Sequence, residues 1–173
     1  MYDHAGRAVQ VSSTNEVALS ADVQSATTFL LDVCRARDAV AETQRPSCFS
    51  LTDVNRTDWY VRHDGFYLSL DPEYDTDDLP QFQLESSFIL HPDTFYPDHY
   101  ALESVNSPHW YIKSHGDGRL GITQRGDVAD YYDSASFKVY DYNASSTYPR
   151  FVRFWFCALI YETLYMNLWN KKQ

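Results

Sequence analysis

Residues 102–111, LESVNSPHWY, repeat with small changes the sequence of residues 51–60, LTDVNRTDWY. Leu, Val, Asn, Trp and Tyr recur at one constant offset, and each unit later closes on Ser-Phe, at 87–88 and at 136–137. A repeat with a period of about 50 residues predicts that one supersecondary unit is copied and packed against its copies.

Each of the two clear copies is typical of four short strands separated by turn residues. In the copy at 48–91 we expect strands at 49–54, 59–63, 66–70 and 87–90. In the copy at 99–141 we expect strands at 100–105, 110–113, 119–122 and 136–140. Asp64-Gly65 is a strong hairpin signal, and acidic loops at 71–81 and 123–133 connect the third and fourth strands.

Residues 8–33 match the last three strands of a third, shorter copy, with Phe29 standing where the other copies have Phe88 and Phe137. Its strands are expected at 7–11, 16–19 and 28–31. Three copies of a four-strand unit predict an all-β fold, the β-trefoil. In this fold six strands close a barrel and six form hairpins that cap one end. The alternative is a generic β-sandwich.

The first copy is incomplete, because only residues 1–6 precede its second strand. We predict that the aromatic segment 151–156 folds back as a closing strand in the vacant place. A short helix is expected to follow, either packed on the barrel or lying at an interface or on a partner. The predicted units are therefore a trefoil at 1–141 and a C-terminal tail at 142–173, with no membrane span.

The chain of 173 residues has a formal net charge of −10. This charge argues against nucleic acid and anionic membrane surfaces as partners, because both require clustered Lys and Arg. A neutral or cationic partner is compatible with it. The sequence sets no oligomeric state.

Three cysteines fit no zinc-binding spacing, so no metal and no cofactor is predicted. Cys34 and Cys48 could pair and leave Cys157 over, and the sequence leaves this open. Glycosylation sequons at 55–57 and 143–145 favour an extracellular, secreted protein, although no signal peptide opens the chain.

The pattern LESVN-x-P-x-WY, followed by a hairpin, a basic-Leu strand and a closing Ser-Ser-Phe, resembles the arabinose-binding domain of α-L-arabinofuranosidase B. The resemblance covers about residues 7–141. It implies a β-trefoil carbohydrate-binding module whose partner is a neutral polysaccharide bearing arabinofuranose, as in arabinoxylan. Sugar pockets of that family use a His ending the second strand, a nearby Tyr, and an Asp shortly before the closing Phe.

In the second copy the resemblance implies a pocket of His63, Tyr60 and Glu85, with Glu85 replacing the family's Asp. The third copy departs further, although Tyr111 matches. His115 stands one residue late and Asp133 one residue early. The first copy has Ala26 at the position of the acid, so no pocket is expected there.

The chemistry of such a pocket is independent of the family. A carboxylate, an imidazole and an aromatic face together match the hydroxyls and the apolar side of a furanose. The alternative is that His63 merely ends a strand and is exposed. Strand alternation is expected to turn Trp59 and Trp110 toward the core and the following tyrosines outward.

No catalytic residue is predicted. A glycosidase requires two carboxyl groups held at a defined separation in a cleft, whereas many of the acidic residues here fall in loops. Arabinofuranosidase activity would therefore belong to a larger parent protein. The leading function is a non-catalytic carbohydrate-binding module. The alternative is a protein-interaction trefoil of a secreted or matrix protein whose sugar pockets have decayed.

Overall fold

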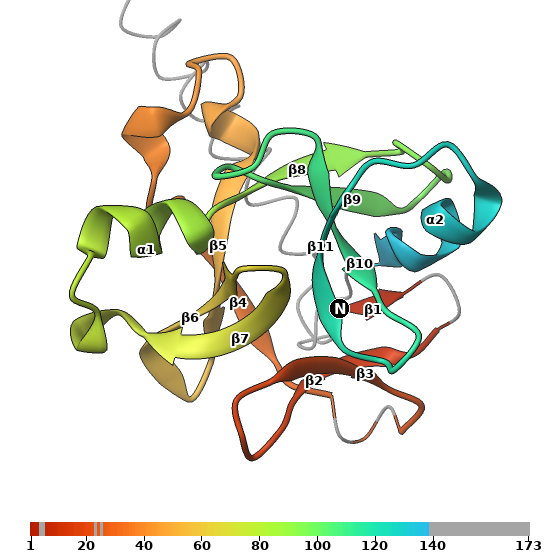
Figure 1. Cartoon of the computed structure of the whole chain (residues 1–173), viewed down its shortest axis with the longest axis horizontal. Helices are drawn as coiled ribbons and strands as arrows, with labels where there is room; N and C mark the ends of the chain where they lie inside the picture. The colour runs from red at the N-terminus through yellow and green to blue at the C-terminus, as the bar shows by residue number, and fades with distance from the viewer. Residues whose placement is uncertain (4–5, 23, 25, 139–173) are drawn as a thin grey trace, which may run out of the picture. The chain divides into compact units, whose positions relative to one another are not determined.

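The computed structural model describes residues 1–3, 6–22, 24 and 26–138, and its strands fall into the three expected copies (Figure 1). The first copy comprises β1 (Tyr2–Asp3), β2 (Ala8–Val11), β3 (Val17–Ser20) and β4 (Phe29–Val33). The second comprises β5 (Cys48–Asp53), β6 (Arg56–Asp64), β7 (Tyr67–Pro72) and β8 (Phe88–Pro92). The third comprises β9 (Tyr100–Ser104), β10 (Trp110–Ser114), β11 (Leu120–Gln124) and β12 (Phe137–Lys138).

The first and fourth strands of the copies form the barrel. Antiparallel pairs join β4 to β5, β5 to β8, β8 to β9, β9 to β12, and β12 to β1. The second and third strands form the hairpins β2–β3, β6–β7 and β10–β11. This arrangement confirms the predicted all-β fold, the β-trefoil.

The three hairpins contact one another by the same backbone hydrogen bond. The carbonyl of Asn15 accepts from Leu70 N at 2.8 Å, and the carbonyl of Phe66 accepts from Ile122 N at 2.8 Å. The carbonyl of Gly118 accepts from Leu19 N at 2.8 Å, which returns to the first copy. Each hairpin tip therefore docks on the third strand of the next copy, and the repeat seen in the sequence becomes a threefold arrangement.

Inward-facing residues of all three copies fill one core. Strand alternation places an apolar side chain from nearly every strand inside it, and Phe88 and Phe137 are fully buried there. The buried members are Val9, Val17, Phe49, Leu51, Val61, Leu68, Leu70, Phe88, Leu102, Ile112, Leu120, Ile122 and Phe137. This shared core holds the strand ends that carry the candidate site.

The first copy has a first strand, contrary to the sequence-based expectation. β1 pairs with β12 through Tyr2 and Lys138 and also with β2, so it lies in the place that appeared vacant. The strand escaped notice because two residues are too few for any alternating pattern. Segment 151–156, predicted to fill that place, lies outside the described residues.

Two helices begin inside the segments predicted to be acidic loops, 71–81 and 123–133, and extend past their ends, so the expectation of plain loops was wrong. α1 (Leu79–Glu85) packs against β6, and α2 (Ala129–Ser134) packs against β10. Asp78 caps α1, because its side chain accepts a hydrogen bond from Gln81 N at 3.1 Å. α1 carries Glu85 at its last position and so fixes where that carboxylate lies.

A disulfide joins Cys34 and Cys48, the pair that the sequence left open. The segment that it closes contains two 3-10 helices, η2 (Arg37–Ala39) and η3 (Arg45–Ser47). The two cysteines form a small buried cluster with Val40 and Ile89, apart from the barrel core. The disulfide therefore fixes this segment, including Arg35, beside the second copy.

Candidate functional site

The two faces of β6 carry different residues. Trp59 and Val61 pack toward the barrel core, as expected, while Tyr60 lies on the opposite face. α1 covers that opposite face, where Phe82 meets the Tyr60 ring edge-on at 6.3 Å between ring centres. Tyr60 points away from the core but is buried by this packing.

His63 lies near the end of β6 and is only 3% exposed, so the alternative of a merely exposed strand-end His is wrong. Its Nε2 is hydrogen-bonded to Ser104 Oγ at 2.9 Å. Burial lowers the pKa of the imidazole below 6.5, while the nearby Glu85 carboxylate and the Gly65 backbone oppose this shift. The buried Nδ1 makes no hydrogen bond of ordinary geometry to any described residue.

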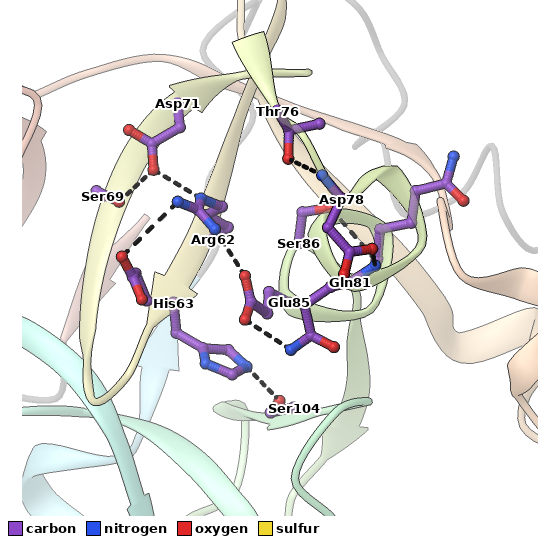
Figure 2. A network of polar contacts seen from close by, with 12 residues as sticks. Arg62, His63, Ser69, Asp71, Thr76, Asp78, Gln81, Glu85, Ser86 and Ser104 are labelled. Atoms are coloured by element: carbon purple, nitrogen blue, oxygen red, sulfur yellow. Dashed lines mark hydrogen bonds and ion pairs between the residues drawn. The ribbon is translucent and has the colours of Figure 1, made fainter. Parts of the chain in front are cut away.

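Glu85 lies close to His63 and ends α1, with its side chain only 11% exposed (Figure 2). Its Oε1 accepts a hydrogen bond from Gln81 Nε2 at 2.8 Å, one turn earlier in the helix. Its Oε2 accepts one from Arg62 Nη1 at 2.7 Å. The structure thus brings together the imidazole and the carboxylate that the sequence paired, although the carboxylate already has two partners.

Arg62 is a member of this group that the sequence did not single out. Its guanidinium lies between two carboxylates, donating to Glu85 and, from Nε, to Asp71 Oδ2 at 2.8 Å (Figure 2). Burial alone would lower the pKa of Arg62, but these hydrogen bonds raise it above its ordinary value and keep the group cationic. A signal was present, since Lys113 occupies the same position in the third copy.

Tyr60 is covered on its outer side by Arg35 from the disulfide-closed segment. The Arg35 guanidinium lies 5.3 Å from the centre of the Tyr60 ring and is held there by Glu73, which accepts hydrogen bonds from it. Burial raises the pKa of Tyr60, and the Arg35 charge partly opposes this. Tyr60 is therefore packed between Arg35 and Phe82, and its ring does not offer an open stacking surface to a ligand.

The predicted residues of the third copy lie apart. Tyr111 is buried against His91 and Phe95. His115 follows β10 in the hairpin turn, with its ring centre 5.1 Å from that of Tyr67, and burial lowers its pKa. Asp133 is exposed on α2 and accepts a hydrogen bond from Tyr96 Oη at 2.6 Å. Within the part of the chain described, no hydrogen bond, ion pair or ring contact links His115 to Asp133.

The two helices explain why the third copy differs. Glu85 is the last residue of α1, and the last residue of α2 is Ser134. The Ser134 hydroxyl donates to the carbonyls of its own helix, at Asp130 and Tyr131. On β10 the residue corresponding to His63 is Ser114. The third copy therefore has hydroxyls where the second has an acid and an imidazole.

Sequence reasoning also missed a buried carboxylate in the third copy. Glu103, within the repeated motif on β9, is 7% exposed. One oxygen accepts a hydrogen bond from His91 Nε2 at 2.6 Å and the other from the backbone of His109 at 2.6 Å. One oxygen thus links β9 to His91 on β8 and the other holds the turn that follows β9, so this carboxylate has a structural role.

In the part of the chain that the structure describes, two imidazoles have a buried ring nitrogen without a partner, at His63 Nδ1 and at His115 Nε2. The second copy adds a largely buried carboxylate, Glu85, close to His63. Such a group can accept and donate hydrogen bonds to a hydroxylated ligand. Among the described residues no cluster of three or more His, Cys, Asp or Glu is arranged to hold a metal ion. These residues are therefore suited to recognise a polar ligand by hydrogen bonding.

Residues 3–139 match the family described as the alpha-L-arabinofuranosidase B (ABFB) domain. The chain belongs to this family. The match covers the described trefoil and confirms the resemblance inferred from the repeated motif. A comparison with curated protein sequences found no match.

The solved structures similar in fold to this ABFB-family chain include arabinofuranosidases and a protein of a different kind. An arabinofuranosidase complexed with arabinofuranosyl-alpha-1,2-xylobiose is 20% identical with a TM-score of 0.55, over 76% of this chain and 30% of that one. A GH54 α-L-arabinofuranosidase soaked with a cyclic sulfate inhibitor is 18% identical with a TM-score of 0.56, over the same shares. A point mutant of Gallus interleukin-1 beta is 18% identical with a TM-score of 0.54, over 79% and 90%.

At these identities the structural matches show the fold alone. The chain corresponds to less than a third of the length of the arabinofuranosidases that it matches. In the described part of the chain, every helix falls short of the length and apolar content needed to cross a bilayer.

Proposed function

We propose that this ABFB-family domain is a non-catalytic carbohydrate-binding module that recognises an arabinofuranose side chain of a neutral polysaccharide at its second copy. The observation that carries the proposal is the His63 imidazole, which lies close to the Glu85 carboxylate and whose buried Nδ1 makes no hydrogen bond of ordinary geometry to any described residue. A buried polar atom without a partner is costly, and a ligand hydroxyl would satisfy it once the surrounding side chains shift to admit the ligand.

Glu85 has capacity left for a sugar. A carboxylate offers about four lone-pair sites, and among the described residues Arg62 and Gln81 occupy two of them. A diol of a furanose can therefore donate to Glu85 while another hydroxyl bonds His63. Charge supports a neutral ligand, because the chain carries −10 overall and Arg62, the cation at the site, is already bonded to two carboxylates.

The geometry favours binding over hydrolysis. Glycoside hydrolysis requires two carboxyl groups facing the scissile bond, one of which gives up a proton. At this site Asp71 and Glu85 both face the Arg62 guanidinium, which lies between them. The proposal therefore assigns no catalytic role to this segment. The Cys34–Cys48 disulfide supports an extracellular location, where such bonds persist.

The test is binding of methyl α-L-arabinofuranoside by titration calorimetry, together with retention on an arabinoxylan affinity gel. Glu85→Gln and His63→Gln are each expected to weaken binding at least about tenfold, because a hydrogen bond to a charged or buried group contributes about 1.5–3 kcal/mol. Ser134→Ala, at the position of the third copy that corresponds to Glu85, is the matched control and should bind as the parent chain does.

Unchanged binding by Glu85→Gln and His63→Gln, with both variants folded by urea denaturation, would overturn this assignment of the site. Absence of binding to any arabinofuranoside, together with a defined protein partner, would instead favour a protein-interaction trefoil.

A further inference from the structure

A second feature lies at the tip of the β6–β7 hairpin and is not part of the proposed furanose site. Phe66 is 60% exposed, which is unusual for a phenylalanine at a tight turn. Its ring is stacked on the indole of Trp110 from β10, with centroids 5.7 Å apart and ring planes inclined by 20°. One face of Phe66 therefore rests on Trp110, and its high exposure leaves the other to solvent.

The Phe66–Trp110 stack is held rigidly. Trp110 packs against the barrel core, and Phe66 is fixed by its carbonyl, which accepts a hydrogen bond from Ile122 N. Gly65 supplies the left-handed backbone conformation of the turn, with φ of 65°. A flat aromatic surface that is already ordered loses little entropy when a ligand settles on it.

Exposed polar residues neighbour this stack in the sequence and in the strand register. Asp64, two residues before Phe66, has a side chain that is 79% exposed. His109, which precedes Trp110, has one that is 81% exposed, and Gln124, opposite Trp110 in the strand register, is also exposed. An apolar surface with hydrogen-bonding groups at its edge is typical of a site for a ligand with one apolar face and a hydroxylated rim.

The same hairpin connects the stack to the furanose site. Phe66 follows His63 across the hairpin turn, and the Arg62 guanidinium that binds Glu85 also lies 3.9 Å from Asp64. We propose that the Phe66–Trp110 stack binds a pyranose ring of the polysaccharide main chain, by contact of its axial C–H face with Phe66, while the side-chain furanose occupies the His63–Glu85 site. The furanose part of this inference rests on the proposed function, and the pyranose part does not.

Two other exposed aromatic residues lack what the Phe66–Trp110 stack offers, an open ring face supported by a second ring. The Tyr67 ring has the Arg119 guanidinium 3.9 Å from its centre, so part of its surface is already covered. Tyr74 is 73% exposed, and among the described residues no aromatic ring supports it. Tyr74→Ala therefore serves as the matched control for loss of an exposed but unsupported ring.

The experiment measures binding of linear xylohexaose, which carries no arabinose, to the full chain by calorimetry. Phe66→Ala should weaken this binding about five- to tenfold, while Phe66→Trp should restore it and Tyr74→Ala should leave it unchanged. Binding of methyl α-L-arabinofuranoside should be the same in all three variants. Equal binding of cellohexaose would also support the inference, since that chain presents the same pyranose face.

The two proposals fail in different ways. If the arabinofuranoside binds and depends on Glu85, but xylohexaose does not bind or binds equally to Phe66→Ala, the pyranose surface is refuted and the furanose site stands. If xylohexaose binding depends on Phe66 while no arabinofuranoside binds, the furanose site is refuted and the pyranose surface stands. Urea denaturation of each variant confirms that it is folded.

Discussion

At the scale of single residues, Arg62 determines how accessible the second-copy site is. It bonds Glu85 and Asp71, and its guanidinium lies 5.4 Å from the centre of the Phe82 ring. Removing one partner of a buried ion pair leaves the other charge uncompensated, so Arg62 is costly to replace. A ligand at Glu85 must therefore share the carboxylate with Arg62 rather than displace it.

His63 provides a prediction about pH. Because burial lowers its pKa, we expect its ring protons to titrate below pH 6.5 in an NMR titration of the folded chain. The unfolded chain binds this proton more readily than the folded one. The free energy of unfolding should therefore fall as pH drops below 6.5, and the contribution of His63 should be fully present above 6.5.

His63→Gln identifies the resonance in that titration, because the signal that it removes belongs to His63. His115 is the internal comparison, since burial lowers its pKa as well. If the signal lost in His63→Gln titrates at or above pH 6.5, the imidazole is not desolvated as the structure shows it, and the proposed site loses its main support.

At the scale of elements, α1 and α2 show what a single sequence does not reveal. Each helix is two turns or less, too short to be stable by intrinsic propensity. Their stability comes from contacts with strands, Phe82 against Tyr60 in one case. In the other, Tyr131 is buried, which raises its pKa to about 12, and donates to the Thr123 carbonyl. The β6–β7 hairpin, in contrast, was predictable, because Asp64-Gly65 is a local turn signal in the sequence.

Asp78→Ala tests how far α1 positions the site. Loss of the cap on Gln81 N should lower the free energy of unfolding by about 0.5–2 kcal/mol, measured by urea denaturation. Because Glu85 ends the same short helix, arabinofuranoside binding should weaken as well. Asp77→Ala removes the neighbouring exposed acid, which does not cap the helix, and should change neither quantity. Equal effects of the two variants would show that charge, not capping, matters here.

At the scale of the whole molecule, the second and third copies approach each other closely at Gly121. A Cβ added there would lie 2.2 Å from the Phe66 carbonyl oxygen, which belongs to the neighbouring hairpin. Gly121→Ala should therefore push the two hairpins apart and cost about 1–3 kcal/mol in the free energy of unfolding. It should also change the fluorescence of Trp110, because the Phe66 stack shifts with its backbone.

Gly116→Ala is the control for that change, because a Cβ at Gly116 has no heavy atom within 4 Å and the backbone there is unstrained. Urea denaturation of the two variants side by side makes the comparison. If Gly121→Ala were as stable as Gly116→Ala, the close approach of the second and third copies would be wrong.

The internal repeat predicted the trefoil because each copy has the same alternation and the same turns, and every copy must bury its face against the others. The resemblance to the arabinofuranosidase B domain, rather than the repeat, predicted the pairing of His63 with Glu85. It did not predict Arg62 between two carboxylates, since this depends on where α1 brings Glu85. The sequence already placed Asp133 one residue early, and the structure shows the result, because α2 ends on Ser134 at the position that corresponds to Glu85.

Three hydrogen bonds join each hairpin tip to the third strand of the next copy. They run from the first copy to the second, from the second to the third, and from the third back to the first. They form a closed circle, unlike the open stack of a solenoid, whose terminal units have a neighbour on one side only. No copy in such a circle is an end at which fraying can begin. A single excised copy would lack both of its neighbours, so the three copies should unfold together as one cooperative unit.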